Sequence, residues 1–187
     1  MSLVKKLSLN LLNLIILIFF LISSAGAEES IFGKVRVIDG DTIVVNKKKI
    51  RLFGIDAPEM KQICKDEFMK DYDCGVKSRS FLQRSILLKL SVPKNLFEKE
   101  EKKNYKVWCN SRGKDRYGRI LGICGYDFLD AYFPYSLNAW MVKNGHAVAY
   151  KEYSKMFIKF EDEAKKSKKG IWQGEFERPN LWRKKNK

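Results

Sequence analysis

Three short segments within residues 31–55 have the pattern of consecutive β-strands, and this pattern constrains the fold more than any other feature of the sequence. "IFGKVRVI" alternates apolar and charged residues, "TIVV" is rich in β-branched residues, and the polar "NKKK" links it to "KIRLFGI", whose first residue is the last lysine of that link. Alternation with a period of two is typical of half-buried strands, and a short polar link favours a hairpin. The sequence therefore predicts three strands, at 31–38, 42–45 and 49–55.

The rest of the chain adds helices and a second pair of strands. We expect helices at 75–88, 135–145 and 154–170, an antiparallel pair at 105–110 and 119–126, and a short strand at 146–150. The order β-β-β-α-β-β-α-β-α suits a short barrel with helices packed on it, for which the OB fold is the usual small example. The predicted class is α+β, mainly β: a five-stranded OB-fold barrel with about three packed helices.

The first 27 residues have the features of an export signal. A basic start with Lys5 and Lys6 precedes an apolar stretch, and Ala25-Gly26-Ala27 matches a signal-peptidase cleavage site. The unbroken apolar run from Leu14 to Ile22 is shorter than the roughly 20 residues that span a bilayer. We therefore predict a signal peptide at 1–27 and an exported protein, periplasmic or secreted, with an uncleaved membrane anchor as the alternative.

The charge of the chain favours an acidic partner. The net charge is +15, and it is +13 without Lys5 and Lys6 of the predicted signal. Nucleic acid is the leading candidate because Lys and Arg that neutralise phosphates release counterions. A solvated surface and an anionic membrane are the alternatives that charge alone leaves open.

The four cysteines fit an oxidising compartment. They allow three pairings, of which Cys64–Cys74 and Cys109–Cys124 are favoured because each pair brackets a short segment. A zinc site is the alternative, although the chain has no C-x-x-C motif and a single histidine. If Cys109 and Cys124 face each other across a hairpin, a constant register puts a type I turn at 115–118.

Polar residues gather in three segments where predicted strands end. The segments carry Asp39, Asp41 and Thr42; Arg51, Asp56 and Glu59; and Asp115, Arg116, Tyr117 and Arg119. Asp41 and Asp56 offer the oxygen ligands that Ca²⁺ or Mg²⁺ prefers. Glu59 is a candidate base for a water molecule, and Arg51 and Arg119 can each present a planar pair of donors to phosphate oxygens. Together these groups suit phosphodiester hydrolysis.

Strand geometry raises one difficulty for a shared site. Arg51 and Asp56 have opposite parity, so in a regular strand their side chains would face opposite sides. Gly54 lies between them, and a glycine within a strand often marks a bulge or a sharp bend. We expect the chain to bend at Gly54 and bring the two side chains together.

Five ordered motifs between about Phe32 and Trp172 resemble the staphylococcal nuclease, or thermonuclease, family. They are "VIDGDT", "IRLFGIDAPE", "DRYGR", "SLNAWMVKNGHAVAY" and "EAKKSKKGIW". The resemblance implies an OB-fold nuclease that cuts DNA and RNA with Ca²⁺, with Mg²⁺ as the alternative cation, and leaves 3′-phosphate ends. It implies metal ligands at Asp41 and Asp56, and catalytic roles for Arg51, Glu59 and Arg119.

The resemblance also extends to substrate contacts and has departures. Ala57 stands where the best-known member has threonine, and only its backbone carbonyl would be needed as a metal ligand. Tyr117 fits the family pattern and the segment around Tyr150 fits it in part. We expect Tyr117, Tyr150 and Lys114 to contact the substrate. The single histidine, His146, is expected to be structural, because one histidine without a partner forms no relay.

Residues 30–173 are thus expected to form a nuclease domain, followed by a basic tail at 174–187. The tail has no clear periodicity. Arg183, Lys184 and Lys185 beside Trp182 suit a nucleic-acid contact or a disordered end. The expected protein is a monomer, with no protein partner, that acts on single-stranded DNA and RNA. The alternative function is that of a noncatalytic OB-fold module of the cell envelope that binds nucleic acid or another polyanion. A third function, an enzyme that acts on acidic polysaccharide, has no motif in its favour.

Overall fold

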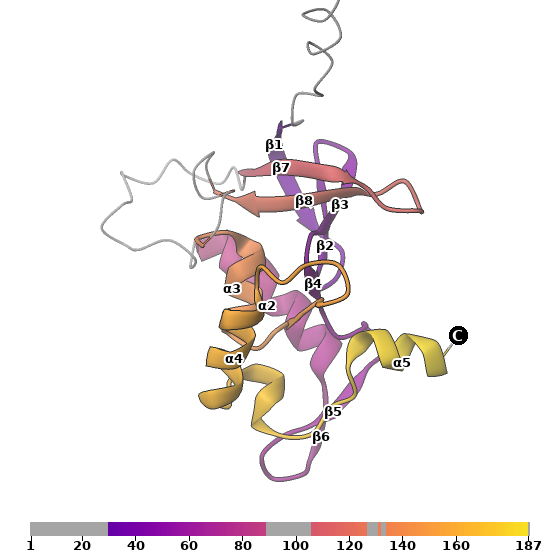
Figure 1. The fold of residues 1–187 in the computed structure, drawn as a ribbon, viewed down its shortest axis with the longest axis vertical. Coiled ribbons are helices and arrows are strands. Elements are labelled where there is room, and N and C mark those ends of the chain that lie inside the picture. Colours follow the sequence, from indigo (N-terminus) through magenta and orange to yellow (C-terminus); the bar gives the residue numbers. More distant parts are fainter. Residues whose placement is uncertain (1–29, 89–105, 127–130, 132–133, 187) are drawn as a thin grey trace, which may run out of the picture.

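The computed structural model describes residues 30–88, 106–126, 131 and 134–186 of the 187-residue chain. A closed five-stranded barrel forms one end of the molecule (Figure 1), with its strands in the order β1-β2-β3-β8-β7. They are β1 (Ser30–Val37), β2 (Thr42–Val45), β3 (Lys48–Leu52), β7 (Lys106–Lys114) and β8 (Ile120–Gly125). The predicted OB-fold barrel is confirmed.

The barrel closes through one parallel pair, β3 with β8, while its other neighbours are antiparallel. A parallel pair needs a long crossover connection. Here the connection includes the helix α2 (Cys74–Leu88). The inward faces of the strands supply fully buried side chains, among them Ile43, Ile50 and Leu52. The interior of the barrel is therefore a packed apolar core.

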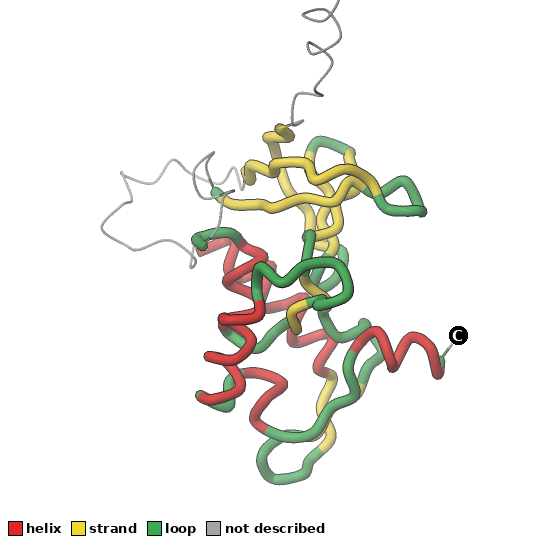
Figure 2. The backbone as a smooth tube through the Cα atoms, viewed as in Figure 1, coloured by secondary structure: helices red, strands yellow, loops and turns green. Residues whose placement is uncertain are grey.

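Three helices are present where the sequence predicted them; the first two contact strands of the barrel, and the third packs on the second helix. Figure 2 shows them as a layer of their own next to the strands, formed by α2, α3 (Leu137–Lys143) and α4 (Ile158–Lys166). Ser136 caps α3 by accepting a hydrogen bond from the Ala139 N–H at 3.1 Å. Phe157, directly before α4, is fully buried in the core.

The predicted third strand, 49–55, is interrupted. β3 ends at Leu52, the chain turns at Phe53 and Gly54, and Ile55–Asp56 then form β4, which pairs with β9 (Val148–Ala149). Gly54 has φ of +74°, which non-glycine residues adopt rarely. A side chain at this position would also meet the ring of Phe157 at 2.9 Å. The bend expected at Gly54 is thus present, and it redirects Asp56.

The hairpin between β7 and β8 differs from the prediction in register. Cys109 and Cys124 are opposite each other, but a bulge between Ser111 and Lys114 shifts the pairing by one residue. Gly113 lies in the bulge with φ of +96°. The turn itself lies at 115–118 as predicted, closed by a 3.0 Å hydrogen bond from the Gly118 N–H to the Asp115 carbonyl.

Two regions are more ordered than the sequence indicated. The segment after β4 contains a small hairpin of β5 (Ile63–Lys65) and β6 (Asp71–Asp73). After a 3₁₀ turn, η2 (Gly170–Gln173), the tail forms the helix α5 (Pro179–Lys185), which lies apart from the other helices (Figure 1). A disordered tail is therefore the wrong expectation for residues 179–185. The signal was Pro179, since proline is favoured at the first position of a helix.

Both favoured disulfides are present. Cys64 joins Cys74 and Cys109 joins Cys124, and all four residues are buried. Two disulfides fit an oxidising compartment. In the part of the chain that the structure describes, no helix has the length and apolarity needed to cross a membrane. The predicted signal lies outside the described residues, so export stays a prediction.

Removal of the barrel disulfide is expected to destabilise the protein. Cys109 and Cys124 are 15 residues apart, and a loop of that size corresponds to about 3 kcal/mol of lost chain entropy in the unfolded state. The double variant Cys109→Ser, Cys124→Ser should lose about that free energy of unfolding in urea, with Cys64→Ser, Cys74→Ser as the comparison. An unchanged unfolding midpoint for the barrel variant would contradict this expectation.

Candidate active site

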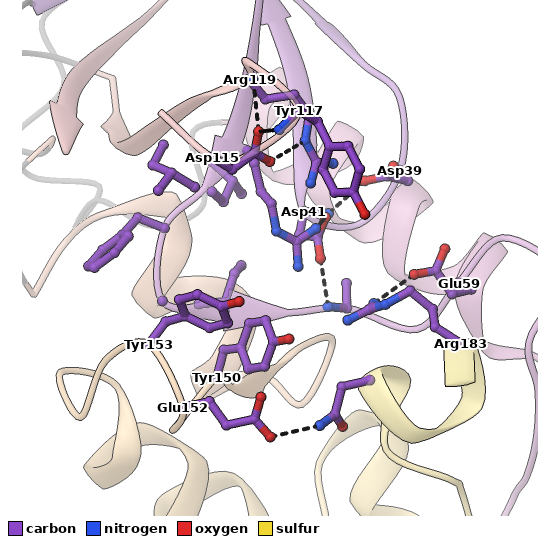
Figure 3. A pocket seen from close by; sticks show the side chains of 18 of the residues that line it. Asp39, Asp41, Glu59, Asp115, Tyr117, Arg119, Tyr150, Glu152, Tyr153 and Arg183 are labelled. Atoms are coloured by element: carbon purple, nitrogen blue, oxygen red, sulfur yellow. Dashed lines mark hydrogen bonds and ion pairs between the residues drawn. The ribbon is translucent and has the colours of Figure 1, made fainter. Parts of the chain in front are cut away.

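The candidate site is a pocket of about 640 Å³ at the rim of the barrel. Five stretches of chain that are far apart in sequence line it, around residues 39–41, 51–59, 114–121, 150–153 and 180–184. Figure 3 shows acidic, basic and tyrosine side chains converging on this space. The structure thus brings together the three polar segments that the sequence singled out, and adds α5.

Arg51 joins the two aspartates proposed as metal ligands. Its Nη1 donates to Asp41 Oδ1 at 2.6 Å, and its Nη2 donates to Asp56 Oδ1 at 2.8 Å. The side chains of Asp41 and Asp56 are 6% and 1% exposed. The turn at Gly54 makes this arrangement possible, because it places Asp56 on the same side as Arg51. The shared site expected from the sequence is therefore present in the geometry.

Asp41 is fixed from several directions. Its Oδ2 accepts the Ala57 N–H at 3.0 Å, and its Oδ1 accepts the Thr42 hydroxyl at 3.2 Å. The Asp41 N–H in turn donates to Asp39 Oδ1 at 3.0 Å. This network holds the start of β2 against the segment after β4. The Ala57 contact uses its N–H, and a role of its carbonyl as a metal ligand stays a proposal.

The carboxylates of Asp39 and Asp56 have raised pKa values. Burial and the neighbouring Asp41 raise the pKa of Asp39 to about 6. Burial also raises the pKa of Asp56, although hydrogen bonds and charge from Arg183 and Arg51 act in the opposite direction. Buried carboxylates this close together favour a bound positive charge. The site is therefore electrostatically suited to cations.

Glu59 lies at the edge of the site, with its side chain 36% exposed. Its N–H donates to Gln62 Oε1 at 3.2 Å, and its carboxylate receives Arg183 Nη1 at 2.7 Å. This partly open position gives the carboxylate access to the pocket.

Arg119 is held by the hairpin turn and not by the aspartate pair. Its Nε donates to Asp115 Oδ2 at 2.7 Å, and Asp115 Oδ1 accepts the N–H groups of Tyr117 and Arg119, each at 2.9 Å. Burial alone would raise the pKa of Asp115, but the bonds from Arg119 and Tyr117 outweigh it and lower the pKa. The turn thus fixes Arg119 at the pocket rim, where its side chain stays 24% exposed.

The expected substrate contacts also line the pocket. Tyr117 is 71% exposed, and the guanidinium groups of Arg116 and Arg119 lie 5.1 and 5.7 Å from the centre of its ring. Lys114 is exposed on the same hairpin. Tyr150 lies at the other side of the pocket against Tyr153, with ring centroids 4.6 Å apart. Sequence reasoning missed Tyr153, because neither periodicity nor a motif marks it.

The donor set fits an oxygen-preferring cation in part. Asp41 and Asp56 are close enough to share one guanidinium, so they could share one divalent cation, with water and a backbone carbonyl as further ligands. Within residues 30–88, 106–126 and 134–186, no group of three or more His, Cys, Asp or Glu is arranged to hold a metal ion. A cation would therefore depend on ligands other than side chains to fill its shell.

His146 lies away from the pocket, as expected of a structural residue. Its ring stacks on Phe81 at 3.9 Å, and burial together with Arg84 and Lys77 lowers its pKa to about 4. Its backbone carbonyl accepts the Ser78 hydroxyl at 2.6 Å. The histidine therefore belongs to the packing between the helix α2 and the segment before β9.

The buried histidine should make stability fall at mildly acidic pH. The unfolded chain protonates this imidazole near 6.5 and the folded protein only near 4, so stability is full above pH 6.5 and is lost as the pH falls towards 4. Between pH 7 and pH 5 this term amounts to about 2 kcal/mol. Urea unfolding at both values should show a smaller loss for His146→Phe than for the wild type. Equal losses would contradict the assignment to His146.

These features define an OB-fold protein with a carboxylate and arginine site at the barrel rim, and the comparisons with known proteins give its family. The family model described as staphylococcal nuclease homologue matches residues 49–174. The chain belongs to this family, and it is a nuclease, a hydrolase that acts on nucleic acid.

Curated relatives include proteins named as nucleases and one named for another process. The chain is 30% identical over 185 residues to an uncharacterized endonuclease of Haemophilus influenzae, covering 95% of this chain and 86% of that protein. It is 31% identical over 168 residues to a micrococcal nuclease of Shigella flexneri, covering 82% and 80% of the two chains. It is also 35% identical over 156 residues to the succinoglycan biosynthesis protein ExoI of Rhizobium meliloti, covering 81% and 69%.

Proposed function

We propose that the protein is an exported, Ca²⁺-dependent, sugar-nonspecific endonuclease that cleaves DNA and RNA to leave 3′-phosphate ends. Mg²⁺ is the alternative cation. The observation that carries the proposal is the single cluster in which Arg51 joins Asp41 to Asp56 beside Glu59. A protein that only binds nucleic acid needs basic and aromatic residues, but it has no need of three converging carboxylates.

The proposed roles follow from position and chemistry. Asp41, Asp56 and the Ala57 carbonyl would hold the cation, which when bound supplies positive charge near a phosphate oxygen. Glu59 accepts a proton from the attacking water, because its carboxylate is the partly exposed one. Arg51 and Arg119 donate to the nonbridging phosphate oxygens as charge develops in the transition state. The bond from phosphorus to the 5′ oxygen then breaks opposite the attacking water, and the 5′ oxygen takes a proton from solvent to become a hydroxyl.

The proposed substrate preference also has a physical basis. The cationic groups around the pocket, Arg51, Lys114, Arg116 and Arg119, suit the backbone phosphates that DNA and RNA share. The exposed rings of Tyr117 and Tyr153 and the neighbouring Tyr150 offer surfaces on which unpaired bases can stack. We therefore propose that single-stranded or frayed nucleic acid is cleaved in preference to stable duplex, by a monomer.

The test is cleavage of end-labelled single-stranded DNA and RNA of one sequence, followed by analysis of the new ends. We expect both to be cut internally at many positions, with 3′-phosphate products that phosphatase treatment converts to 3′-hydroxyl. Matched duplexes should be cut more slowly. Cleavage of one sugar type alone, or 5′-phosphate products throughout, would refute the corresponding part of the proposal. Salt-sensitive binding without cleavage would favour the noncatalytic OB-fold module.

A further inference from the structure

A third arginine enters the site from the C-terminal helix. Arg183 of α5 donates from Nη1 to Glu59 Oε1 at 2.7 Å and from Nη2 to Asp56 Oδ2 at 3.0 Å, and its Nη1 also lies 2.9 Å from Asp56 Oδ1. Figure 3 shows its side chain reaching from α5 to Glu59. Residues 179–185 lie beyond the 49–174 range that the family model matches. The site therefore has a component that the matched region does not contain.

The approach of the chain to α5 is held in place. The Glu175 carbonyl accepts the Lys65 N–H at 2.8 Å, and the Glu177 carbonyl accepts Gln62 Nε2 at 2.7 Å. Gln62 also accepts the Glu59 N–H, so one side chain links the approach to α5 with the backbone of the candidate base. These contacts make residues 175–177 part of the fold of the site.

The helix is anchored to the rest of the fold near its N-terminal end. Arg178 Nη2 donates to the buried Glu161 Oε1 at 2.8 Å, and Asn180 Nδ2 donates to Glu152 Oε1 at 3.3 Å. Lys185 forms an ion pair with Glu177. Arg183 is thus delivered to the carboxylates by a docked helix.

Arg183 covers the carboxylate that a metal ion would need. Asp56 Oδ1 has two guanidinium groups as neighbours, those of Arg51 and Arg183, and Oδ2 receives Arg183. With both arginines in place the Asp56 side chain is only 1% exposed. A divalent cation that binds Asp56 must therefore displace a guanidinium, because the cation and the guanidinium are both positive and repel each other at contact distance.

Of the two arginines, Arg183 is the one that a cation can displace from Asp56 more easily. Its side chain is 31% exposed, against 13% for Arg51, and it lies on a helix of seven residues. Arg51 lies in β3 between barrel strands and also holds Asp41. If Arg183 loses its contact with Asp56, only the helix α5 is disturbed. If Arg51 loses its contact with Asp56, the rim of the barrel is disturbed.

We propose that Arg183 is a positioning residue of the nuclease site, which pairs with Asp56 and Glu59 until a divalent cation displaces it from Asp56. The inference rests on the proposed function, because it needs a cation at Asp41 and Asp56. Arg183 holds both carboxylates in the protein without metal and sets the cation concentration that the site requires. Once it leaves Asp56, its Nη1 pair with Glu59 keeps that carboxylate in position.

The experiment is calorimetric titration of the oxidised protein with CaCl₂. Wild type is compared with Arg183→Ala, Arg183→Lys and the control Lys184→Ala, which removes the same charge from the same helix. We expect Arg183→Ala to lower the Kd for Ca²⁺ by about fivefold or more, which is the usual size of such coupling. Lys184→Ala should change the Kd by less than about twofold, because a charge without a direct carboxylate contact contributes little. Arg183→Lys should fall between the wild type and Arg183→Ala, and it keeps the test available if Arg183→Ala does not fold.

Unchanged or weaker Ca²⁺ binding in Arg183→Ala would overturn the proposal, as would equal tightening in Lys184→Ala, which indicates a net-charge effect. Absence of Ca²⁺ binding in every variant would overturn it as well.

A second measurement uses the wild type alone. Amide hydrogen exchange of residues 180–186 should become faster in Ca²⁺, because α5 loses its contact with Asp56, and unchanged or slower exchange would refute displacement. Neither measurement reads cleavage, so their failure is distinct from failure of the nuclease assignment.

Discussion

Replacing Glu59 by glutamine is expected to lower kcat by about 10²–10⁴-fold, the usual contribution of a general base. Glutamine keeps the shape of the side chain and an oxygen that can accept from Arg183, but it cannot take a proton from water. The side chain is partly exposed, so the substitution leaves no buried charge without a partner. The fold should therefore survive, and the loss should lie in kcat and not in KM.

The measurement is steady-state cleavage of a single-stranded substrate in Ca²⁺, with thermal unfolding of the same samples as a check on folding. Glu152→Gln is the matched control, because Glu152 lines the same pocket and pairs with Asn180, outside the aspartate cluster. It should stay within about threefold of wild type, as expected of a pocket residue outside the chemistry. A Glu59→Gln protein with near wild-type kcat would show that another group accepts the proton.

Replacing Glu161 by alanine is expected to have the largest effect on stability, a loss of about 3–5 kcal/mol in the free energy of unfolding. Glu161 is fully buried, and its Oε1 receives Lys165 at 2.7 Å, Arg178 at 2.8 Å and Lys151 at 3.0 Å. Its Oε2 accepts the Ala149 N–H of β9 at 2.8 Å. Burial would raise the pKa of Glu161, but these hydrogen bonds outweigh it and lower the pKa to about 2.

The reason is that alanine leaves a buried backbone donor unsatisfied and three cations without their common partner. Urea unfolding at pH 7 gives the value. Glu161→Gln is the control, because it keeps one acceptor and removes only the charge, so its loss should be smaller. Since Arg178 precedes α5, Glu161→Ala should also speed hydrogen exchange in residues 180–186. A loss below about 1 kcal/mol would place Glu161 with ordinary surface ion pairs.

Local features of the structure were predictable from the sequence. The pairing of Cys109 with Cys124 was favoured because the two cysteines bracket a short segment, and the hairpin turn at 115–118 followed from placing them opposite each other. The bend at Gly54 followed from a conflict of parity between Arg51 and Asp56, which a glycine could resolve. In each case the interacting residues lie within 15 positions of one another along the chain.

Features that depend on contacts between distant segments were not predictable in the same way. The bulge at Gly113 shifts the register without changing the pattern of apolar residues. Arg183 is separated from Glu59 by 124 residues, and nothing in a basic tail indicates which carboxylates it will meet. Only the docking of residues 175–180 on the rest of the fold decides that. The candidate site was therefore found from motifs, while its C-terminal wall had to be found from the structure.

The central claim is that the cluster of Asp41, Asp56 and Glu59 with Arg51 and Arg119 hydrolyses phosphodiester bonds with a bound divalent cation. Its most direct test is cleavage of a labelled single-stranded DNA by the oxidised protein in Ca²⁺, in Mg²⁺ and in excess chelator, beside Arg119→Ala. We predict cleavage in Ca²⁺, none in chelator, and a loss of about 10²–10³-fold in Arg119→Ala from the missing transition-state donor. Equal cleavage in chelator, or full activity of Arg119→Ala, would contradict the account.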